Sequence, residues 1–495
     1  MIQEHRYVVV GAGPAGLQIG HFLQERGADY VIVERERSAG GFFARFPRHG
    51  RLISLNRARS WSDDPETRLR WDWNSLLSDD PSLLFPAYSD DHFPSPDDLR
   101  RYLTDFHTTH DLRIAFGTGI SRVTCKEEGF RLETGDGDAF QAECLIWACG
   151  WGGPYVPDIP GIEHAEGYED MTVDPERFLG KRVLILGKGN AAFETANALR
   201  DHASTIHLAS PRPVRLAWNS RHPGDVRGCH GELLDSHRFG APHALLDCAV
   251  ERISFDGAVH TVDIVHNHAG GGRERLEYDT VLRCTGFRMD TEVFADELRT
   301  LPGGRLPALT SDWESESLPG LYVAGTMMQA RDTGRGSSAF IHGFRYNLRT
   351  LSRLLAERYD GVRLPRTHVP RPALTGTVLD RVNRSSALWA QADYLVDALV
   401  ITEHGIERYE DLPEDYAVER FGDLVTVGLR QSGAVALLSE GATRGSGAIH
   451  PAVRVFRNGV LTGELHLPGS VAARWHDPER HVAPLDRFFD RLLPL

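Results

Sequence analysis

The sequence predicts an α/β protein with two Rossmann-like units and a small α/β appendage at its C-terminus. Two glycine turns support this, GAGPAG at 11–16 and GKGNAA at 187–192, because each follows an apolar strand and opens a helix. The third observation is the change in character beyond residue 365, where no further turn of this kind occurs. Two such turns indicate two bound dinucleotides, as in a two-dinucleotide-binding flavoprotein fed by a nicotinamide.

The first turn lies in a favourable context. Residues 7–10 form an apolar run typical of a buried parallel strand, and the three glycines permit a tight turn and a close approach of pyrophosphate. The following helix N-terminus faces the phosphates. A second strand, 30–33, ends at Glu34, whose carboxylate can accept hydrogen bonds from ribose hydroxyls. We predict the FAD site here; the alternative is a glycine-rich turn with no ligand.

The second turn follows residues 182–186 and precedes a helix expected over 191–200. Its pattern is G-x-G-x-x-A. The next strand, 205–208, is followed by ASPR without an acid, so nothing there repels a ribose 2′-phosphate and Arg212 can pair with one. NADPH is therefore predicted over NADH, and the alternative for Arg212 is a solvated loop arginine.

Composition restricts the remaining possibilities. A length of 495 residues implies two or three domains, and a net charge of −14 argues against nucleic acid or an anionic membrane as the main partner. The chain begins directly at a nucleotide-binding strand and has no apolar stretch near about 18 residues, so we expect a cytoplasmic protein without a signal peptide. A homodimer is left open.

The six cysteines include no C-x-x-C pair, which argues against a dithiol-dependent reductase. Cys144 and Cys149 are the nearest pair and are expected to be buried, inert thiols. The histidine pairs His107/His110 and His266/His268 have no accompanying cysteine or acid cluster, so we predict no metal site.

The other elements follow in chain order. Residues 38–95 are expected to be loops around a flavin pocket, and Ser95 caps a helix over 97–110. Short strands, with a turn at 135–137, lead to a crossing at 148–161 and a return at 284–287. A long loop spans 211–244, a strand ends at Gly325, and a helix covers 338–358.

The C-terminal appendage is predicted from residue 363 onward. A linker at 365–374 precedes helices over 376–399 and 484–492 and strands over 423–429, 433–438 and 452–466, the last a hairpin turning at Asn458 and Gly459. We predict four segments: a FAD-binding domain in two parts, an NADPH-binding domain between them, and the appendage, at 1–159, 284–362, 160–283 and 363–495.

These motifs resemble the class B flavin-dependent monooxygenases, the group of the flavin-containing and N-hydroxylating monooxygenases. More closely, FPRHGRLISLN, DWNSLLS, VLILGKGNAAFETA and FIHGFRY resemble the FAD-dependent oxidoreductase domain-containing flavoproteins related to the flavoprotein of ER-associated degradation. Two departures stand out. EGYEDM at 166–171 replaces the fingerprint F-x-G-x-x-x-H, which weakens the case for oxygenation, and Gly325-Thr326 replaces the usual Gly-Asp.

The resemblance implies an NADPH-dependent FAD monooxygenase, in which hydride passes to FAD and a flavin hydroperoxide oxygenates a small nucleophile with O₂ as co-substrate. Arginines in 43–59 and 212–227 suit a carboxylate, so N-hydroxylation of an amine or amino acid is the predicted reaction. Two alternatives are an NADPH reductase or oxidase without oxygen insertion, and a flavin-stabilised binding protein.

Asn56 is the first candidate for a catalytic hydrogen-bond donor, with a turn residue as the alternative, and Asn219 is the second. Trp73, Asn74 and Trp218 are weaker pocket candidates. The predicted cofactor-binding residues are Gly11, Gly13, Pro14, Ala15, Gly16, Glu34, Arg35, Gly41, Phe42, Arg45, Val123, Gly150, Gly187, Gly189, Asn190, Ala191, Ser210, Arg212, Gly286, Gly325 and Thr326.

Overall fold

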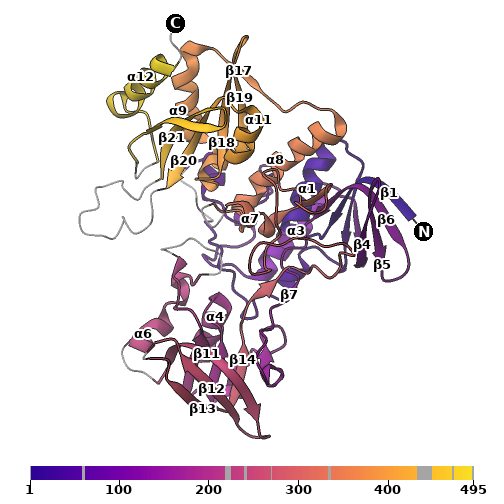
Figure 1. The fold of residues 1–495 in the computed structure, drawn as a ribbon, viewed down its shortest axis with the longest axis vertical. Helices are drawn as coiled ribbons and strands as arrows, with labels where there is room; N and C mark the ends of the chain where they lie inside the picture. The colour runs from indigo at the N-terminus through magenta and orange to yellow at the C-terminus, as the bar shows by residue number, and fades with distance from the viewer. Residues whose placement is uncertain are drawn as a thin grey trace.

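The computed structural model describes residues 2–57, 59, 62–217, 225–238, 242–268, 270–332, 336–431, 449–470 and 473–492. These form three units, each built on its own large sheet (Figure 1). The first unit lies at the right of the view, the second at the bottom and the C-terminal unit at the top. Helix α8, Ile341–Asp360, belongs to the first unit and also contacts the C-terminal unit.

The first sheet has the strand order β3-β2-β1-β6-β5-β4, with β16 beside β6. Its core strands pair in parallel, and β4 and β5 add an antiparallel extension. The strands are β1 Ile2–Val10, β2 Tyr30–Glu34, β3 Ile114–Phe116, β4 Ile120–Lys126, β5 Gly129–Thr134, β6 Ala139–Trp147 and β16 Leu321–Val323. Tyr7 to Val10 are all buried, as expected for a central parallel strand.

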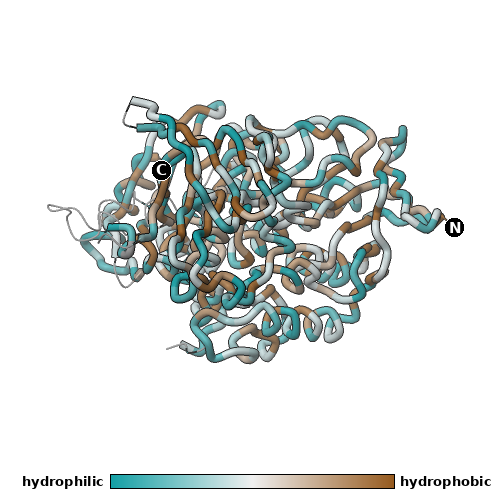
Figure 2. The backbone as a smooth tube through the Cα atoms, turned by 90° about the horizontal axis from the view of Figure 1, so that it is seen from below, coloured by the Kyte–Doolittle hydropathy of each residue, from teal (hydrophilic) through white to brown (hydrophobic). Residues whose placement is uncertain are grey.

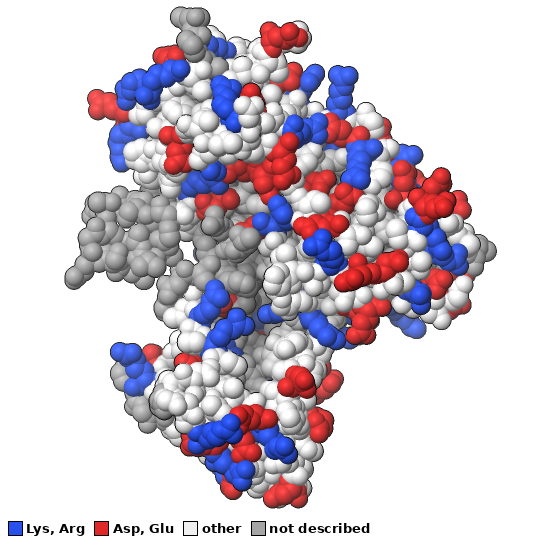
Figure 3. Space-filling view, in the orientation of Figure 1, with Lys and Arg blue, Asp and Glu red and all other residues white. Residues whose placement is uncertain are grey.

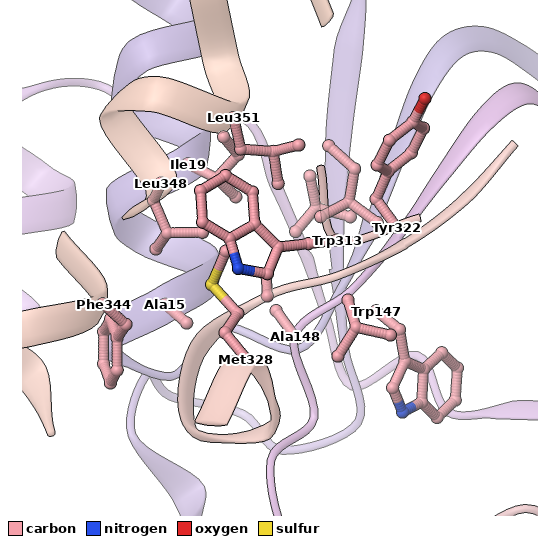
Figure 4. Close-up of a cluster of buried hydrophobic side chains, with 14 of the residues drawn as sticks. Ala15, Ile19, Trp147, Ala148, Trp313, Tyr322, Met328, Phe344, Leu348 and Leu351 are labelled. Atoms are coloured by element: carbon pink, nitrogen blue, oxygen red, sulfur yellow. The ribbon is translucent and has the colours of Figure 1, made fainter. Parts of the chain in front are cut away.

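Helices α1, Pro14–Glu25, α2, Pro65–Trp71, α3, Pro96–Thr109, and the short α7, Gln329–Asp332, complete the first unit with α8. Figure 4 shows Ile19 of α1 and Leu348 and Leu351 of α8 around Trp313 in the buried cluster of this unit. The predicted cap of α3 is confirmed, because Ser95 accepts a hydrogen bond from Asp98 N in a capping box.

The second sheet repeats this plan in the order β13-β12-β11-β10-β9-β14-β8. Strands β8 to β11 and β14 pair in parallel, and β12 and β13 form an antiparallel extension. The strands are β8 Glu166–Gly167, β9 Arg182–Leu186, β10 Thr205–Ser210, β11 Ala244–Phe255, β12 His260–His266, β13 Arg273–Tyr278 and β14 Thr280–Arg283. Helices α4, Asn190–Leu199, and α6, Glu232–Arg238, accompany it.

Two connections join the first and second units at the predicted positions. Their short strands β7, Gly153–Pro154, and β15, Phe287–Arg288, pair with each other in an antiparallel ribbon. The predicted loop over 211–244 contains more structure than expected, since it includes α6 and a 3₁₀ turn at Gly228–His230.

The C-terminal unit contains an antiparallel sheet in the order β17-β19-β18-β20-β21-β22. The strands are β17 Thr367–Val369, β18 Leu395–Thr402, β19 Gly405–Pro413, β20 Leu424–Gln431, β21 Ile449–Arg457 and β22 Val460–His466. The helices are α9 Leu374–Arg384, α10 Ser386–Ala390, α11 Glu414–Phe421 and α12 Ala483–Leu492.

The predicted helix over 376–399 is confirmed in its first part, by α9 and α10, and is wrong in its last part. Helix α9 ends at Arg384, Ser385 caps the short α10, and Leu395 begins the central strand β18. The first five residues of β18, which include Asp397, are all buried, so the strand lacks the alternation of buried and exposed residues that separates a strand from a helix. The predicted linker over 365–374 is also wrong in part, because residues 367–369 form the edge strand β17.

The hairpin at Asn458 and Gly459 is confirmed, and both residues have positive φ, 49° and 75°. The predicted strand over 433–438 lies outside the described residues. Figure 2 shows apolar segments running through the interior of the molecule and polar ones on its outside. No helix in the described ranges has the length and apolarity needed to cross a bilayer.

Candidate functional site

The first glycine turn holds β1 and α1 in close contact. Gly11 has a φ of +105° and donates from its N–H to Val33 O at 2.8 Å. A Cβ atom on Gly16 would lie 1.8 Å from Gly11 O, so only glycine fits at this position. A Cβ on Gly13 would meet no atom within 4 Å, so the space in front of the turn is open.

Glu34 closes this turn from the end of β2. Its two oxygens accept from Ala12 N at 2.6 Å and from Glu36 N at 2.9 Å, and the residue is buried. The carboxylate therefore fixes the backbone of the turn. Its position at the strand end is the one from which an acid contacts a ribose.

The second turn has the same backbone arrangement. Gly187 has a φ of +124° and donates to Ala209 O at 2.8 Å, and a Cβ there would lie 2.2 Å from Cys284 O. The third position is Ala192, which is fully buried and carries its Cβ without conflict. Helix α4 thus packs less tightly on its turn than α1 does.

Both helices begin without a side-chain cap, at Gly13 and Gly189. The first N–H groups of a helix have no acceptor within the helix, and the helix dipole makes this end positive. Asp64, Ser95 and Ser385 cap α2, α3 and α10, whereas α8, α9 and α11 also lack a side-chain cap but do not follow a glycine turn. Two uncapped N-termini behind glycine turns fit the pyrophosphates of two dinucleotides.

The strand end near Arg212 differs from the sequence prediction. The parallel pairing of β10 and β11 sets Ser210 opposite Asp247, so an acid does lie beside this strand end. Lys188, within the glycine turn, is buried and forms an ion pair with that carboxylate, and its ammonium also donates to Leu246 O at 3.0 Å. The ammonium offsets the negative charge that would otherwise oppose a 2′-phosphate.

Arg305 is a second cation that sequence reasoning did not find. Its guanidinium lies over Trp151, 5.3 Å from the ring centroid, and donates to Phe287 O at 3.1 Å. Burial lowers the pKa of Arg305, and the positive charge of Arg212 lowers it further, so the two guanidinium groups lie close enough for their charges to interact. No local motif marks Arg305, because it comes from a loop about 90 residues after Arg212.

The end of β16 approaches the first glycine turn. A Cβ on Gly325, whose φ is +83°, would lie 2.6 Å from Ala15 Cβ, so the structure brings these two predicted residues together. The Thr326 hydroxyl donates to Ala339 O at 3.2 Å, which fixes the loop leading into α8.

An aromatic stack lies at the N-terminal end of α8. His342 stacks on Trp73, with ring centroids 4.7 Å apart, and on Phe340 at 5.5 Å. Arg227 of the second unit lies over Trp73 at 5.4 Å. This contact joins the first and second units and involves the predicted pocket residue Trp73.

Asn56 is held by backbone contacts. Its side-chain amide donates to Ser89 O at 2.5 Å, and its N–H donates to His92 O at 2.9 Å. These contacts favour the alternative that Asn56 holds a turn and does not act as a catalytic donor. Asn74 is buried beside it and donates to Leu55 O at 3.2 Å, while its side-chain carbonyl has no protein partner. Trp218 and Asn219 lie outside the described residues.

Other predicted contacts are already engaged within the protein. Val123 N donates to Val293 O and Val123 O accepts from Ala295 N, both at 2.8 Å, and its side chain is buried. The structure therefore places Val123 in the interior, where it offers no group to a ligand. Arg45 pairs with Glu36 at 2.9 Å.

The other predicted cofactor-binding residues lie around the two turns, some with exposed side chains and some with engaged ones. Arg35 is exposed, and Phe42 packs on Phe46 at 5.0 Å with much of its ring exposed. Asn190 uses its side chain to bind Asp225 O and Arg227 N. The remaining predicted residues line the turns and crossings: Gly41, Gly150, Ala191, Ser210 and Gly286, with Pro14 at the start of α1.

A half-buried acid on α4 was also missed. Glu194 accepts from the Tyr168 hydroxyl at 2.9 Å, and that hydroxyl in turn accepts from Arg48 N at 2.9 Å. Burial raises the pKa of Glu194 to about 7. Next to it His49 contacts Thr195 Oγ1 at 3.2 Å, and burial lowers the pKa of His49 to about 4. These groups join the loop after Phe46 to the second unit.

The cysteine prediction holds for Cys144 and not for Cys149. Cys144 is buried, and burial raises its pKa well above the usual value. Cys149 is exposed at the crossing rather than buried, where its thiol donates to Val10 O at 3.3 Å. Across the described ranges all six cysteines are free, and no three His, Cys, Asp or Glu side chains converge as metal ligands.

Comparisons with known proteins agree with this geometry. A family model described as pyridine nucleotide-disulphide oxidoreductase matches residues 8–325. The mouse FAD-dependent oxidoreductase domain-containing protein 2 is 37% identical over 443 residues, which span 83% of this chain and 67% of the mouse protein. The probable indole-3-pyruvate monooxygenase YUCCA1 of Arabidopsis thaliana is 27% identical over 264 residues, 51% of this chain and 55% of that protein.

Among solved structures, a flavin-containing monooxygenase from Stenotrophomonas maltophilia superposes with a TM-score of 0.55 at 24% identity, covering 72% of this chain and 99% of that one. This similarity confirms the predicted two-dinucleotide-binding fold.

Proposed function

This chain belongs to the pyridine nucleotide-disulphide oxidoreductase family and is a homologue of FAD-dependent oxidoreductase domain-containing protein 2, and on that premise we propose that it is an NADPH-dependent flavin monooxygenase. Its cofactors are FAD and NADP(H). The observation that carries the proposal is the pair of uncapped helix N-termini behind the two glycine turns. When bound at the first turn, FAD would supply the chemistry that accepts hydride from NADPH and reduces O₂.

The residues around the turns have distinct proposed roles. Gly11, Gly13 and Gly16 with the start of α1 hold the FAD pyrophosphate, and Glu34 holds its ribose. The turn at 187–192 holds the NADPH pyrophosphate, and Arg212 and Arg305 bind its 2′-phosphate. These roles follow the predicted division into a split FAD-binding domain at 1–159 and 284–362, an NADPH-binding domain at 160–283 and an appendage at 363–495.

For the substrate we propose an amine or amino acid that is hydroxylated on nitrogen. Burial lowers the pKa of His230 to about 4, and the positive charges of Arg227 and Arg51 lower it further. The guanidinium groups of Arg51, from the first unit, and Arg227, from the second, therefore both lie near this side chain. Two cations from two units, beside Trp73, suit a substrate carboxylate.

A specific observation supports a second candidate, an NADPH oxidase or reductase without oxygen insertion. Met171 occupies the position of the fingerprint histidine and is buried, and its backbone carbonyl accepts from the Arg48 guanidinium at 2.6 Å. The segment 166–171 therefore serves to join the units, and it supplies no histidine there.

One experiment separates these candidates. The purified protein is reduced with NADPH without oxygen, then mixed with O₂ and a panel of amines and amino acids, and NADPH consumed is compared with hydroxylamine and H₂O₂ formed. Hydroxylamine equal to NADPH consumed supports the monooxygenase. H₂O₂ alone with every substrate supports the oxidase, and bound FAD that NADPH does not reduce supports a binding protein.

A further inference from the structure

An arginine-lined cavity lies where the first unit meets the C-terminal unit. Its volume is about 310 Å³. Five arginines line it, Arg349 and Arg353 of α8, Arg381 and Arg384 of α9 and Arg408 of β19. Three carboxylates, Glu66, Asp380 and Glu410, and one serine complete the lining.

The cavity is separate from the proposed dinucleotide sites. Arg349 and Arg353 lie eight and twelve residues after Ile341, so they are about 12 and 18 Å along α8 from its N-terminal end. That end carries the aromatic stack of Trp73, Phe340 and His342. Figure 3 shows basic and acidic side chains intermixed over the face it displays, without a broad basic patch.

The floor of the cavity is a closed ion-pair network. Arg381 binds Asp397 through two nitrogens, at 2.6 and 3.0 Å, and reaches Asp411 at 3.0 Å. Arg349 binds Asp411 at 2.7 Å, and both acids are 1% exposed. These contacts satisfy the buried carboxylates and hold α8 and α9 against β18 and β19.

Arg408 is paired with Glu410 at 2.5 Å, and Glu410 also lies 3.5 Å from Arg381. The other two arginines, Arg353 and Arg384, have no such close partner. The nearest carboxylate to Arg353 is Asp411 at 4.0 Å, and that acid already serves Arg349 and Arg381. Arg384 lies 3.6 Å from Asp64 and 3.8 Å from Asp380 with 62% of its side chain exposed. Arg353 thus faces the cavity without a hydrogen-bonded acid, and Arg384 stands at its mouth.

Two buried guanidinium nitrogens in the lining also have an unused hydrogen-bond donor. The Nε atoms of Arg349 and Arg408 are buried with no hydrogen-bond partner in the protein. Burial lowers the pKa of Arg353, and the neighbouring charge of Arg349 lowers it further. Placing cations this close together has an electrostatic cost that a bound anion would remove.

Glu66 lines the cavity but is engaged by other donors. Its Oε2 accepts from Ser386 N at 2.8 Å and Ser386 Oγ at 2.7 Å, at the start of α10. Tyr346 donates to the same Ser386 hydroxyl at 2.6 Å, so Glu66 is part of the junction between units. Asp380 is 60% exposed at the rim.

We propose that this cavity binds a small oxyanion, a phosphate or carboxylate group of a small molecule, through Arg353 and Arg384. Guanidinium groups donate paired hydrogen bonds that match both oxyanions. The volume lies at the lower end of the range for small-molecule sites, about 300–1,000 Å³. Because the lining comes from α8, α9 and β19, a bound anion also stabilises the junction. The proposal does not depend on the proposed reaction.

The test uses the full-length protein with its bound FAD. Inorganic phosphate and citrate are titrated separately by calorimetry, with NaCl matching the ionic strength so that general screening cancels. We expect saturable binding of at least one anion and a rise in Tm with its concentration. Stronger phosphate binding identifies a phosphate ligand, and stronger citrate binding identifies a carboxylate ligand.

Variants locate the site. Arg353→Gln is expected to weaken binding at least tenfold, whereas Arg363→Gln, an exposed arginine just beyond α8, leaves it unchanged. Arg212→Gln shows whether the nicotinamide site contributes to the signal, and it too should leave the cavity binding unchanged. Should Arg353→Gln fail to fold, Arg384→Gln at the exposed mouth takes its place. Absence of saturable binding, or equal affinities in the Arg353 and Arg363 variants, overturns the proposal.

Discussion

The first and second glycine turns repeat one backbone arrangement around different side chains. In each, the leading glycine donates to the neighbouring strand at 2.8 Å, through Gly11 to Val33 O and through Gly187 to Ala209 O. The chain returns beside each turn in the same way, since Ala148 N donates to Val10 O and Cys284 N donates to Leu186 O. Both following helices start uncapped.

The side chains differ at three equivalent positions. The third turn position is Gly16 in one and Ala192 in the other. The acid Glu34 at the first strand end corresponds to the region of Ser210 and Arg212, where Asp247 is neutralised by Lys188. The third pair of equivalent positions lies in the helices that follow the turns. On α1, Gln18 exchanges two hydrogen bonds with the backbone of Leu77, at 3.0 and 2.6 Å. On α4, Glu194 accepts a hydrogen bond from the Tyr168 hydroxyl.

On the proposed function, the shared backbone of the turns would hold the two pyrophosphates and the neighbouring side chains would select the dinucleotide. The first turn has glycine at its third position and is closed by an acid. The second has alanine there, two nearby arginines and a half-buried acid whose pKa is raised to about 7.

The largest effect is expected from Gly16→Ala. A Cβ at this position lies 1.8 Å from Gly11 O, and neither backbone segment can move without separating β1 from α1. We expect a loss of about 4 kcal/mol or more in the free energy of unfolding, with loss of bound FAD. Denaturant unfolding and the visible flavin absorbance per protein measure both.

The matched change at the second turn is Ala192→Gly. It removes a Cβ that the turn accepts, so the expected loss is only about 1 kcal/mol from helix propensity and packing. FAD content stays that of the wild type. Equal losses in the two variants would show that the turns do not differ in tightness.

Glu194→Gln places on α4 the same neutral residue that α1 has at the equivalent position, Gln18. Because burial raises the pKa of Glu194 on folding, its contribution to stability is complete below about pH 4.5 and is lost as pH rises through about 7. The variant should therefore be more stable than wild type above pH 7, by up to about 3 kcal/mol, and equal to it near pH 4.5. Tm measured across this range checks the sign.

The control for this variant is Glu163→Gln, at an exposed position of the second unit. Its Tm difference from wild type should not change with pH. A Glu194→Gln variant that is less stable than wild type at pH 8 would contradict a carboxyl pKa raised by burial.

Glu34→Gln tests the acid that closes the first turn. Glu34 accepts with two oxygens from Ala12 N and Glu36 N, and glutamine has one acceptor oxygen, so one N–H loses its partner. An unsatisfied buried donor costs about 2 kcal/mol, or about 30-fold in FAD affinity. Reconstitution of the FAD-free protein measures it, and an unchanged affinity would remove Glu34 from the site.

Arg212→Gln is expected to have the smallest effect and the most specific one. Loss of one exposed charge-assisted contact should raise KM for NADPH about tenfold and leave KM for NADH and the FAD content unchanged. Arg305→Gln should act in the same direction. Arg273→Gln, an exposed arginine on β13, is the control. A parallel rise of KM for both nicotinamides argues against a 2′-phosphate contact.

The sequence by itself determined the two dinucleotide-binding units. Their signals are local, because a buried strand, a glycine turn and an opening helix occupy consecutive residues, and the structure has β1, β9, α1 and α4 where they were predicted. The cap at Ser95 and the hairpin at Asn458 are local for the same reason. The helix predicted over 376–399 was wrong only at its C-terminal end, because β18 is buried on both faces there and lacks the alternation that marks a strand.

Only the tertiary structure decided which side chains meet. Asp247 lies beside Ser210 through strand pairing, and Arg305 approaches Arg212 across about 90 residues of chain. The arginine cavity joins helices and a strand from two units, and burial within the folded protein raises the pKa of Glu194, against the opposing effect of its hydrogen bond from Tyr168. Such contacts depend on packing between distant segments, and no sequence pattern records the distance between residues far apart in the chain.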